Sequence, residues 1–99
     1  MSALPENHDL YFLPTPDTRV IAVAELTPSK PPSAQPNSVD RAEELMRRAA
    51  AGELERRAPI SIVATATGYT IIDGNATYGV AVRHSWRTLP TRTLVEDAR

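Results

Sequence analysis

The sequence predicts a small mixed α/β domain of the α+β type, in which two main helices accompany one mixed sheet. Two observations lead to this prediction. Runs rich in β-branched residues alternate with segments of helical periodicity, and segments rich in proline and glycine separate them. A chain of 99 residues, 41% of them hydrophobic, has room for one modest core. We therefore expect a single domain over residues 18–99, preceded by a proline-rich arm over residues 1–17.

The N-terminal arm, residues 1–17, cannot form a continuous helix, because Pro5, Pro14 and Pro16 interrupt it. Its one apolar patch either packs onto the domain itself or contacts a partner. Large exposed apolar patches are uncommon on monomers, which favours packing onto the domain. The same four residues are nevertheless the first candidates for an interaction surface: Leu10, Tyr11, Phe12 and Leu13.

The first strand is predicted over Thr18–Leu26, because it is a compact run of apolar and β-branched residues. A loop over 27–36 follows, in which proline is too frequent for regular structure. A helix is expected to begin at Ser38 or Asp40, with Asp40 and Glu43 as a capping pair, and to stop near Gly52. Residues 53–57 are expected to add at most one further turn.

The second half of the domain is predicted to be a hairpin, a helix and a last strand. The hairpin pairs residues 60–66 with 69–73 around a turn at Thr67-Gly68. A short helix over 76–85 follows, with Asn75 or Asp73 as its cap, and the last strand covers 91–95. Gly79 interrupts the helical pattern, which indicates a close approach between two backbone elements.

Composition excludes several classes of function. Eleven basic and twelve acidic residues give a net charge of -1, whereas a nucleic-acid-binding surface normally carries a basic surplus. The absence of cysteine removes disulfides, zinc–thiolate sites, iron–sulfur clusters and thiol chemistry. No apolar run approaches the roughly 18 residues that span a bilayer, so we expect a cytoplasmic protein with no membrane contact. His8 and His84 lack metal-ligand spacing, so no metal site is expected.

The charged residues of the first predicted helix are expected to pair with one another. Glu43–Arg47 and Glu44–Arg48 are four residues apart with the acid first, which is the favourable orientation. Arg83, Arg87 and Arg92 are less neutralised and are an alternative source of positive charge for the loop described next, although Arg83 lies about two helical turns from Asn75 and would point away from it.

A strand runs into a glycine turn and then into a helix at Asp73-Gly74-Asn75-Ala76-Thr77. The first N–H groups of a helix lack partners within the helix and carry its positive dipole end, so this order of elements suits an anion. The loop contains no lysine or arginine. From these residues alone, a plain strand-to-helix turn with an asparagine cap remains the alternative.

The span from Arg19 to Val95 resembles the N-terminal domain of the ParB/sulfiredoxin superfamily. The resemblance rests on pieces that occur in the right order. Ala58-Pro59-Ile60-Ser61-Ile62 is similar to the family's QPI-V strand, and the stretch from Gly68 to Asn75 is similar to its Y-(L/I)-I-x-G element. Trp86-Arg87-Thr88-Leu89-Pro90 is similar to the ending that precedes the last strand.

The two boxes that hold nucleotide in ParB-like proteins are changed in this chain. The G-E-R-R-like box is Gly74-Asn75-Ala76-Thr77, and the Q-P-R-like box is Gln35-Pro36-Asn37, so the family's acid and arginines are missing. The resemblance thus implies a phosphate or nucleotide site, at Gln35 and residues 74–77, that has degenerated. Sulfiredoxin's reductase chemistry needs a cysteine in this loop, and there is none.

The resemblance implies a small bacterial ParB-like binding or regulatory module that acts through contacts with a protein partner or as a homo-oligomer. Small proteins of this kind occur in plasmid, phage and toxin–antitoxin systems. The alternative is a phosphoryl-transfer enzyme or nuclease that uses CTP or ATP with Mg2+. In that alternative Asp73 is the candidate metal ligand or general base, and residues 74–77 hold the phosphate.

Overall fold

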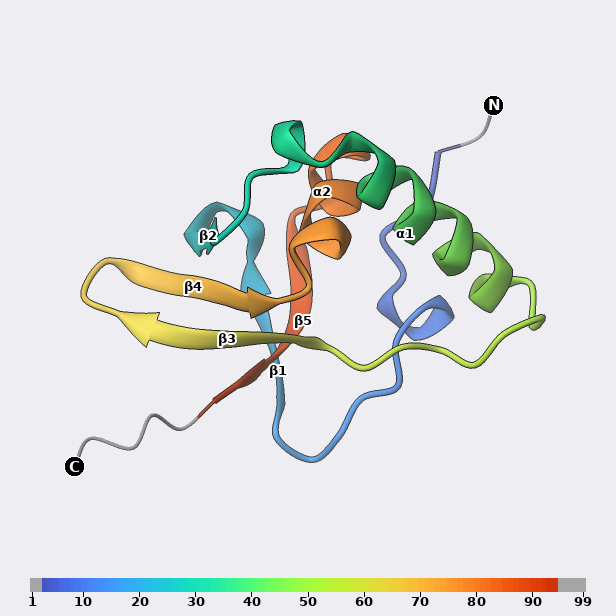
Figure 1. The fold of residues 1–99 in the computed structure, drawn as a ribbon. Helices are drawn as coiled ribbons and strands as arrows, with labels where there is room; N and C mark the ends of the chain where they lie inside the picture. The colour runs from blue at the N-terminus through green and yellow to red at the C-terminus, as the bar shows by residue number, and fades with distance from the viewer. Residues whose placement is uncertain (1–2, 95–99) are drawn as a thin grey trace.

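A computed structural model describes residues 3–94 of the chain and contains one five-stranded mixed sheet with two α-helices (Figure 1). The predicted fold class is confirmed, and so is the order strand, helix, hairpin, helix, strand. Short 3-10 turns cover His8–Leu10, Val23–Glu25 and Pro32–Ala34. The strands and helices are β1 (Thr18–Ala22), β2 (Leu26–Pro28), α1 (Pro36–Ala50), β3 (Ile60–Thr65), β4 (Gly68–Asp73), α2 (Asn75–Arg83) and β5 (Thr88–Thr93).

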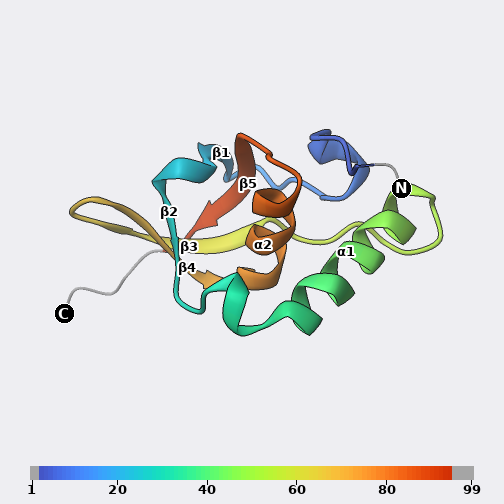
Figure 2. The ribbon, with the colours of Figure 1, turned by 90° about the horizontal axis from the view of Figure 1, so that it is seen from above.

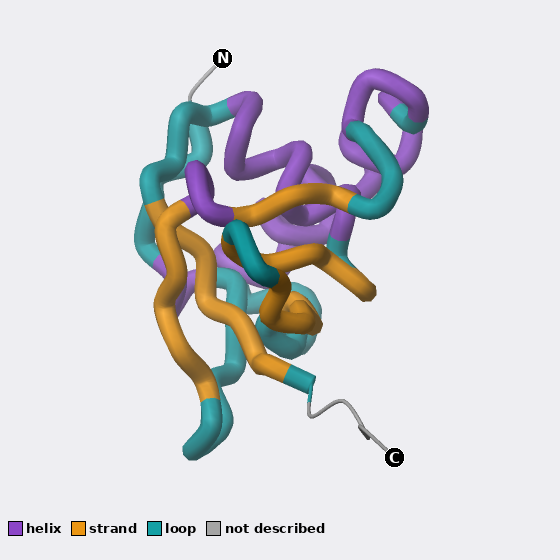
Figure 3. The backbone as a smooth tube through the Cα atoms, turned by 90° about the vertical axis from the view of Figure 1, so that its left-hand side faces the viewer, coloured by secondary structure: helices purple, strands orange, loops and turns teal. Residues whose placement is uncertain are grey.

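The sheet has the order β1-β5-β3-β4-β2. β1 with β5 and β3 with β4 are antiparallel pairs, whereas β3 with β5 and β2 with β4 are parallel. The register places buried Ile62 opposite buried Ile71, and buried Ile21 opposite buried Leu89. These side chains share the face of the sheet that meets the helices. The tube view shows the strands as a layer beside the two helices (Figure 3).

α2 packs on the sheet, and α1 packs against α2 (Figure 2). A side chain at Gly79 of α2 would place its Cβ 2.6 Å from Val39 Cγ2 of α1, which is closer than real Cβ contacts. The predicted close approach at Gly79 is therefore confirmed, and the missing side chain is what allows the two helices to touch. No helix within residues 3–94 is long and apolar enough to cross a membrane.

The start of α1 differs from the prediction. The helix begins at Pro36, before Ser38 and Asp40, and no side chain caps it. Proline suits the first helical position, because its fixed φ is already helical and the N–H it lacks would have no helical partner there. The expected Asp40–Glu43 capping pair was therefore wrong, and both carboxylates lie inside the helix. Gly52, with φ +81°, follows the last turn as predicted.

Three further boundaries were wrong. The first predicted strand is broken by the turn at Val23–Glu25, where Val23 N–H donates to Arg87 O (2.8 Å), so β1 and β2 lie at opposite edges of the sheet. Residues 53–57 add no helical turn, because the backbone of Arg57 pairs with residues 11–13 instead. The last strand begins at Thr88, three residues earlier than predicted, and residue 95 lies outside the described residues.

The N-terminal arm packs as part of the core. Tyr11 and Phe12 are 0% and 1% exposed, and the Tyr11 ring stacks on Trp86 with centroids 5.3 Å apart. The favoured prediction, that this patch packs onto the domain itself, is therefore confirmed for Tyr11 and Phe12, and the alternative in which these two rings form an interaction surface was wrong. Leu10 is half-buried against the same core, and Leu13 is 43% exposed.

Candidate functional site

An open cleft of about 450 Å³ lies at the N-terminal end of α2. It brings together the turn between β4 and α2, the start of α1, the loop after β2 and the segment before β3. A smaller hollow of about 220 Å³ adjoins it and shares Arg57, Asp73, Gly74 and Thr77. The cleft is lined by Ser29, Lys30, Gln35, Ser38, Arg57, Asp73, Gly74, Asn75, Ala76 and Thr77. All the phosphate-binding residues expected from the sequence are thus on one surface.

Gly74 sets the geometry of this end of α2 for two physical reasons. Its φ of +114° lies in a region that L side chains rarely adopt. A Cβ at this position would also lie 2.4 Å from Ile60 Cγ2, so the turn passes directly against the first residue of β3. The first helical bond runs from Tyr78 N–H to Gly74 O (2.9 Å). The N–H groups of residues 75–77 precede it and have no acceptor within the helix.

Asn75 is not the expected helix cap. The residue before α2 is Gly74, and no side chain caps the helix, so neither Asn75 nor Asp73 has the predicted capping role. The Asn75 side chain instead bonds the loop after β2. Its Oδ1 accepts from the backbone N–H of Ser29 (3.0 Å) and of Lys30 (3.3 Å), and its Nδ2 donates to Ser29 Oγ (3.0 Å). These bonds hold Lys30 at the edge of the cleft.

Gln35 reaches the cleft from the residue just before α1. Its Nε2 is buried and has no hydrogen-bond partner among residues 3–94. Thr77 is 3% exposed and lies against the floor of the cleft, whereas Asp73 is exposed at its rim. No group of three or more metal-binding side chains occurs within the described part of the chain.

Arg57 is the cation that the sequence analysis missed at this site. Arg57 lines both hollows, and its Nη1 is buried without a hydrogen-bond partner in the described residues. Burial lowers the pKa of Arg57, and the nearby Asp73 carboxylate acts in the opposite direction. The hairpin register contains a signal that would have found it. Because Ser61 pairs with Asp73, the segment just before β3 must lie beside the turn at Gly74.

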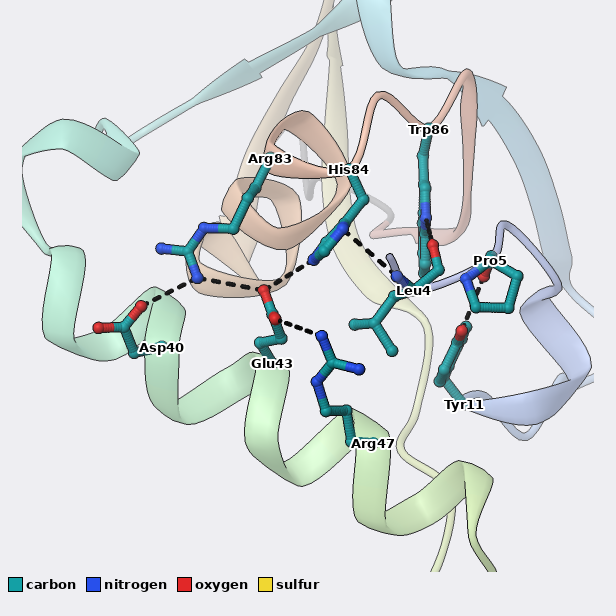
Figure 4. Close-up of polar contacts among 9 residues, drawn as sticks. All are labelled: Leu4, Pro5, Tyr11, Asp40, Glu43, Arg47, Arg83, His84 and Trp86. Carbon is teal, nitrogen blue, oxygen red and sulfur yellow. Dashed lines mark hydrogen bonds and ion pairs between the residues drawn. The ribbon is translucent and has the colours of Figure 1, made fainter. Parts of the chain in front are cut away.

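A second polar cluster lies at the other end of α2, centred on Glu43 of α1 (Figure 4). Glu43 Oε1 accepts from Arg83 Nη1 (3.1 Å) and lies 2.8 Å from His84 Nε2, and Glu43 Oε2 accepts from Arg47 Nη2 (2.9 Å). Leu4 N–H donates to His84 Nδ1 (3.3 Å), so the Nε2 of this histidine carries a proton and donates to Glu43. Burial raises the pKa of Glu43, but these hydrogen bonds outweigh it and lower the pKa to about 2.

This second cluster decides two predictions about charge. The predicted Glu43–Arg47 pair is confirmed. Arg48 forms an ion pair with Glu53 (3.4 Å) instead of with the predicted Glu44. Arg83 also pairs with Asp40 (2.9 Å), so the alternative in which Arg83 supplies positive charge to the glycine turn was wrong. Its carboxylate partners on α1 hold it at the opposite end of α2.

The sheet order, the glycine turn into α2 and the packed helix pair together describe the fold of this chain. The crystal structure of sulfiredoxin from Arabidopsis thaliana is similar to this chain with a TM-score of 0.57, over 82% of this chain and 88% of that chain. The two sequences are 14% identical. The predicted resemblance to the ParB/sulfiredoxin superfamily is thus confirmed for the fold. In sequence, the chain matches no family model and no curated protein.

Proposed function

We propose that this chain is a small binding module that holds a phosphorylated ligand in the cleft at the N-terminal end of α2. One observation carries the proposal: Arg57 and Gln35 both line this cleft, and each has a buried donor, Nη1 and Nε2, with no partner among residues 3–94. Buried donors are nearly always satisfied, so a pair of unsatisfied donors in one cleft indicates a ligand with acceptor oxygens. The N–H groups of residues 75–77, which have no acceptor within the helix, add donors on the same side.

Phosphate fits these donors better than a neutral ligand does. A guanidinium presents parallel N–H groups that match phosphate oxygens, and bonds between ions are the strongest class of hydrogen bond. Lys30 at the rim adds a second positive charge. The volume of about 450 Å³ lies within the usual range for small-molecule sites. A nucleotide such as CTP or ATP with Mg2+ is therefore the first ligand to test, with Asp73 at the rim as the candidate contact for the metal ion.

Binding is favoured over catalysis because the cleft has few groups able to move a proton or attack a bond. Its one carboxylate is Asp73, which is exposed and lies near Arg57. The Asn75 amide is already bonded to Ser29 and Lys30, so it is a structural group in this site. We therefore propose regulation of a protein partner as the consequence of binding, with a plasmid, phage or toxin–antitoxin system as the setting that the resemblance implies.

Calorimetric titration with CTP, ATP and GTP, each with Mg2+, tests the proposal. We expect one of them to bind with a Kd between roughly 100 μM and 1 mM, which corresponds to a few charge-assisted hydrogen bonds. Arg57→Met should weaken this binding at least tenfold. The matched control is Arg92→Met, which removes the same charge from an exposed ion pair with Asp17, and it should change the Kd less than twofold.

Two outcomes would overturn the proposal. If none of the three nucleotides binds and inorganic phosphate also produces no response, the cleft is not a phosphate site. If any nucleotide is hydrolysed at a rate that Asp73→Asn abolishes, the chain is an enzyme and the alternative prediction holds.

A further inference from the structure

The backbone of Arg57 is held from both sides by the N-terminal arm. Arg57 N–H donates to Tyr11 O (2.8 Å), and Leu13 N–H donates to Arg57 O (2.8 Å). Phe12 and Arg57 accordingly form an isolated parallel bridge, where the arm crosses the segment before β3 (Figure 1). Both polar backbone groups of the residue that supplies the cation are therefore bonded to a segment more than 40 positions away in the sequence.

The arm is itself anchored along its length. Trp86 Nε1 donates to Leu4 O (2.9 Å), and the Tyr11 hydroxyl donates to Pro5 O (2.7 Å), as Figure 4 shows. The Glu6 carboxylate accepts from the backbone N–H groups of Arg87 (2.6 Å) and Thr88 (3.2 Å). With the buried ring of Phe12, these contacts fix the short segment that bonds Arg57.

We propose that the N-terminal arm is a positioning element of the binding site, which holds the Arg57 guanidinium in the cleft in the geometry that binds phosphate. The choice of phosphate rests on the proposed function, whereas the positioning of Arg57 does not. A long arginine side chain loses considerable rotamer freedom when it is ordered, so fixing its backbone lowers the entropy cost of binding.

The backbone bond at Leu13 allows a clean test. Leu13→Pro removes the N–H that donates to Arg57 O, while Leu13→Ala keeps it and shortens the same exposed side chain. The two variants therefore differ in whether residue 13 can donate a backbone hydrogen bond to Arg57 O. Two readouts are needed on the full chain: the affinity for inorganic phosphate, and the order of the Arg57 side chain from the heteronuclear NOE of its Nε–H group.

We expect Leu13→Ala to match the wild type in both readouts. Leu13→Pro should weaken phosphate binding three- to tenfold and make the Arg57 Nε–H group more mobile, while unfolding stays cooperative. Equal affinity and equal Arg57 order in the two variants would overturn the proposal. If Leu13→Pro fails to fold, Glu6→Gln replaces it, because it weakens a distant anchor of the arm and should shift both readouts in the same direction to a smaller extent.

The two proposals fail in different ways. If the wild type binds no phosphate but Leu13→Pro mobilises Arg57, the proposed function is wrong and the positioning role stands. If the wild type binds phosphate and Leu13→Pro changes neither readout, the cleft is a phosphate site and the arm does not position Arg57.

Discussion

Charged and polar side chains gather at both ends of α2, but their hydrogen bonding differs between the two ends. At the C-terminal end, Glu43 is bonded by Arg47, Arg83 and His84, and each of its carboxylate oxygens has a partner. At the N-terminal end, the buried donors of Arg57 and Gln35 have no partner within residues 3–94. A buried polar or charged group without a partner normally lowers stability, so its presence indicates a site for a ligand. A group whose hydrogen bonds are already satisfied within the protein gives no such indication. This difference distinguishes a structural cluster at one end of α2 from the proposed binding site at the other.

The two ends also differ in the kind of group that forms them. The C-terminal cluster is assembled from side chains of two packed helices and the backbone of Leu4. The N-terminal cleft is formed mainly by backbone features. These are the positive φ of Gly74, the N–H groups that follow it and have no acceptor within the helix, and the pairing of Arg57 with the arm. Substitutions at the first end should therefore change stability, and substitutions at the second should change binding, apart from Gly74 itself.

The largest expected effect is that of Gly74→Ala. Alanine would have to keep the positive φ of Gly74, which L residues rarely adopt, and its Cβ would lie 2.4 Å from Ile60 Cγ2. Backbone strain and overpacking therefore both destabilise the variant. We expect the free energy of unfolding to fall by roughly 3–4 kcal/mol in chemical denaturation. Gly52→Ala is the matched control, because Gly52 also has a positive φ but its Cβ would meet nothing within 4 Å. It should cost about 1 kcal/mol. Equal costs would show that Ile60 does not set the path of the turn.

Glu43→Gln should be the next largest change, and it should affect stability alone. The lowered pKa of Glu43, about 2 against the ordinary 4.5, corresponds to about 2–3 kcal/mol of stability at pH 7 for this 13% exposed side chain. Nucleotide or phosphate affinity, measured by titration of the folded variant, should stay within twofold of the wild type. A loss of affinity as large as that of Arg57→Met would mean that the two ends of α2 are not independent.

The same carboxylate predicts a pH dependence. Because the pKa of Glu43 is lowered in the folded state, its contribution is complete above about 4.5 and is lost as pH falls toward about 2. The difference in unfolding free energy between the wild type and Glu43→Gln should therefore shrink over this range. Denaturation curves recorded at several pH values between 7 and 2 measure it. A difference that stays constant down to pH 2 would contradict the paired state of Glu43.

The smallest effect on stability is expected for Arg57→Met. Methionine keeps apolar contacts of the side chain and removes a buried donor that has no partner in the described residues. The free energy of unfolding should stay within about 1 kcal/mol of the wild type, or rise, while binding is lost. Denaturation and titration of the same sample check both. A strong loss of stability would show that Arg57 is a structural residue.

Local patterns were sufficient for most of the fold. The alternation over 60–73 predicted the hairpin, and the spacing from Val39 to Ala49 predicted the helix that they form. The start of α1 was missed because Pro36 was counted as a loop residue, although the first helical position favours proline. Residues 74–77 were predicted from the local pattern of a glycine turn into a helix, and Gln35 from the resemblance to the Q-P-R box. The structure places them on one cleft, and their role in binding phosphate stays a prediction.

What the sequence did not reveal depends on long-range pairing. Arg57 lies in a segment that was expected to add at most one helical turn, and its place in the cleft follows from the β3–β4 register and the contact with residues 11–13. For Tyr11 and Phe12 the sequence favoured packing onto the domain but left an interaction surface open, because Trp86, on which Tyr11 stacks, lies 75 positions later. The contacts of Arg57 with residues 11–13 and of Tyr11 with Trp86 join segments that no short window of sequence contains.

Mapping the binding of inorganic phosphate by NMR tests the contrast between the two ends of α2 most directly. We predict that phosphate shifts the backbone amides of residues 75–77, the Gln35 side-chain amide and the Arg57 Nε–H group, and leaves the signals of Glu43, Arg83 and His84 unchanged. The account would be contradicted if no signal shifts, or if the signals that shift belong to the Glu43 cluster.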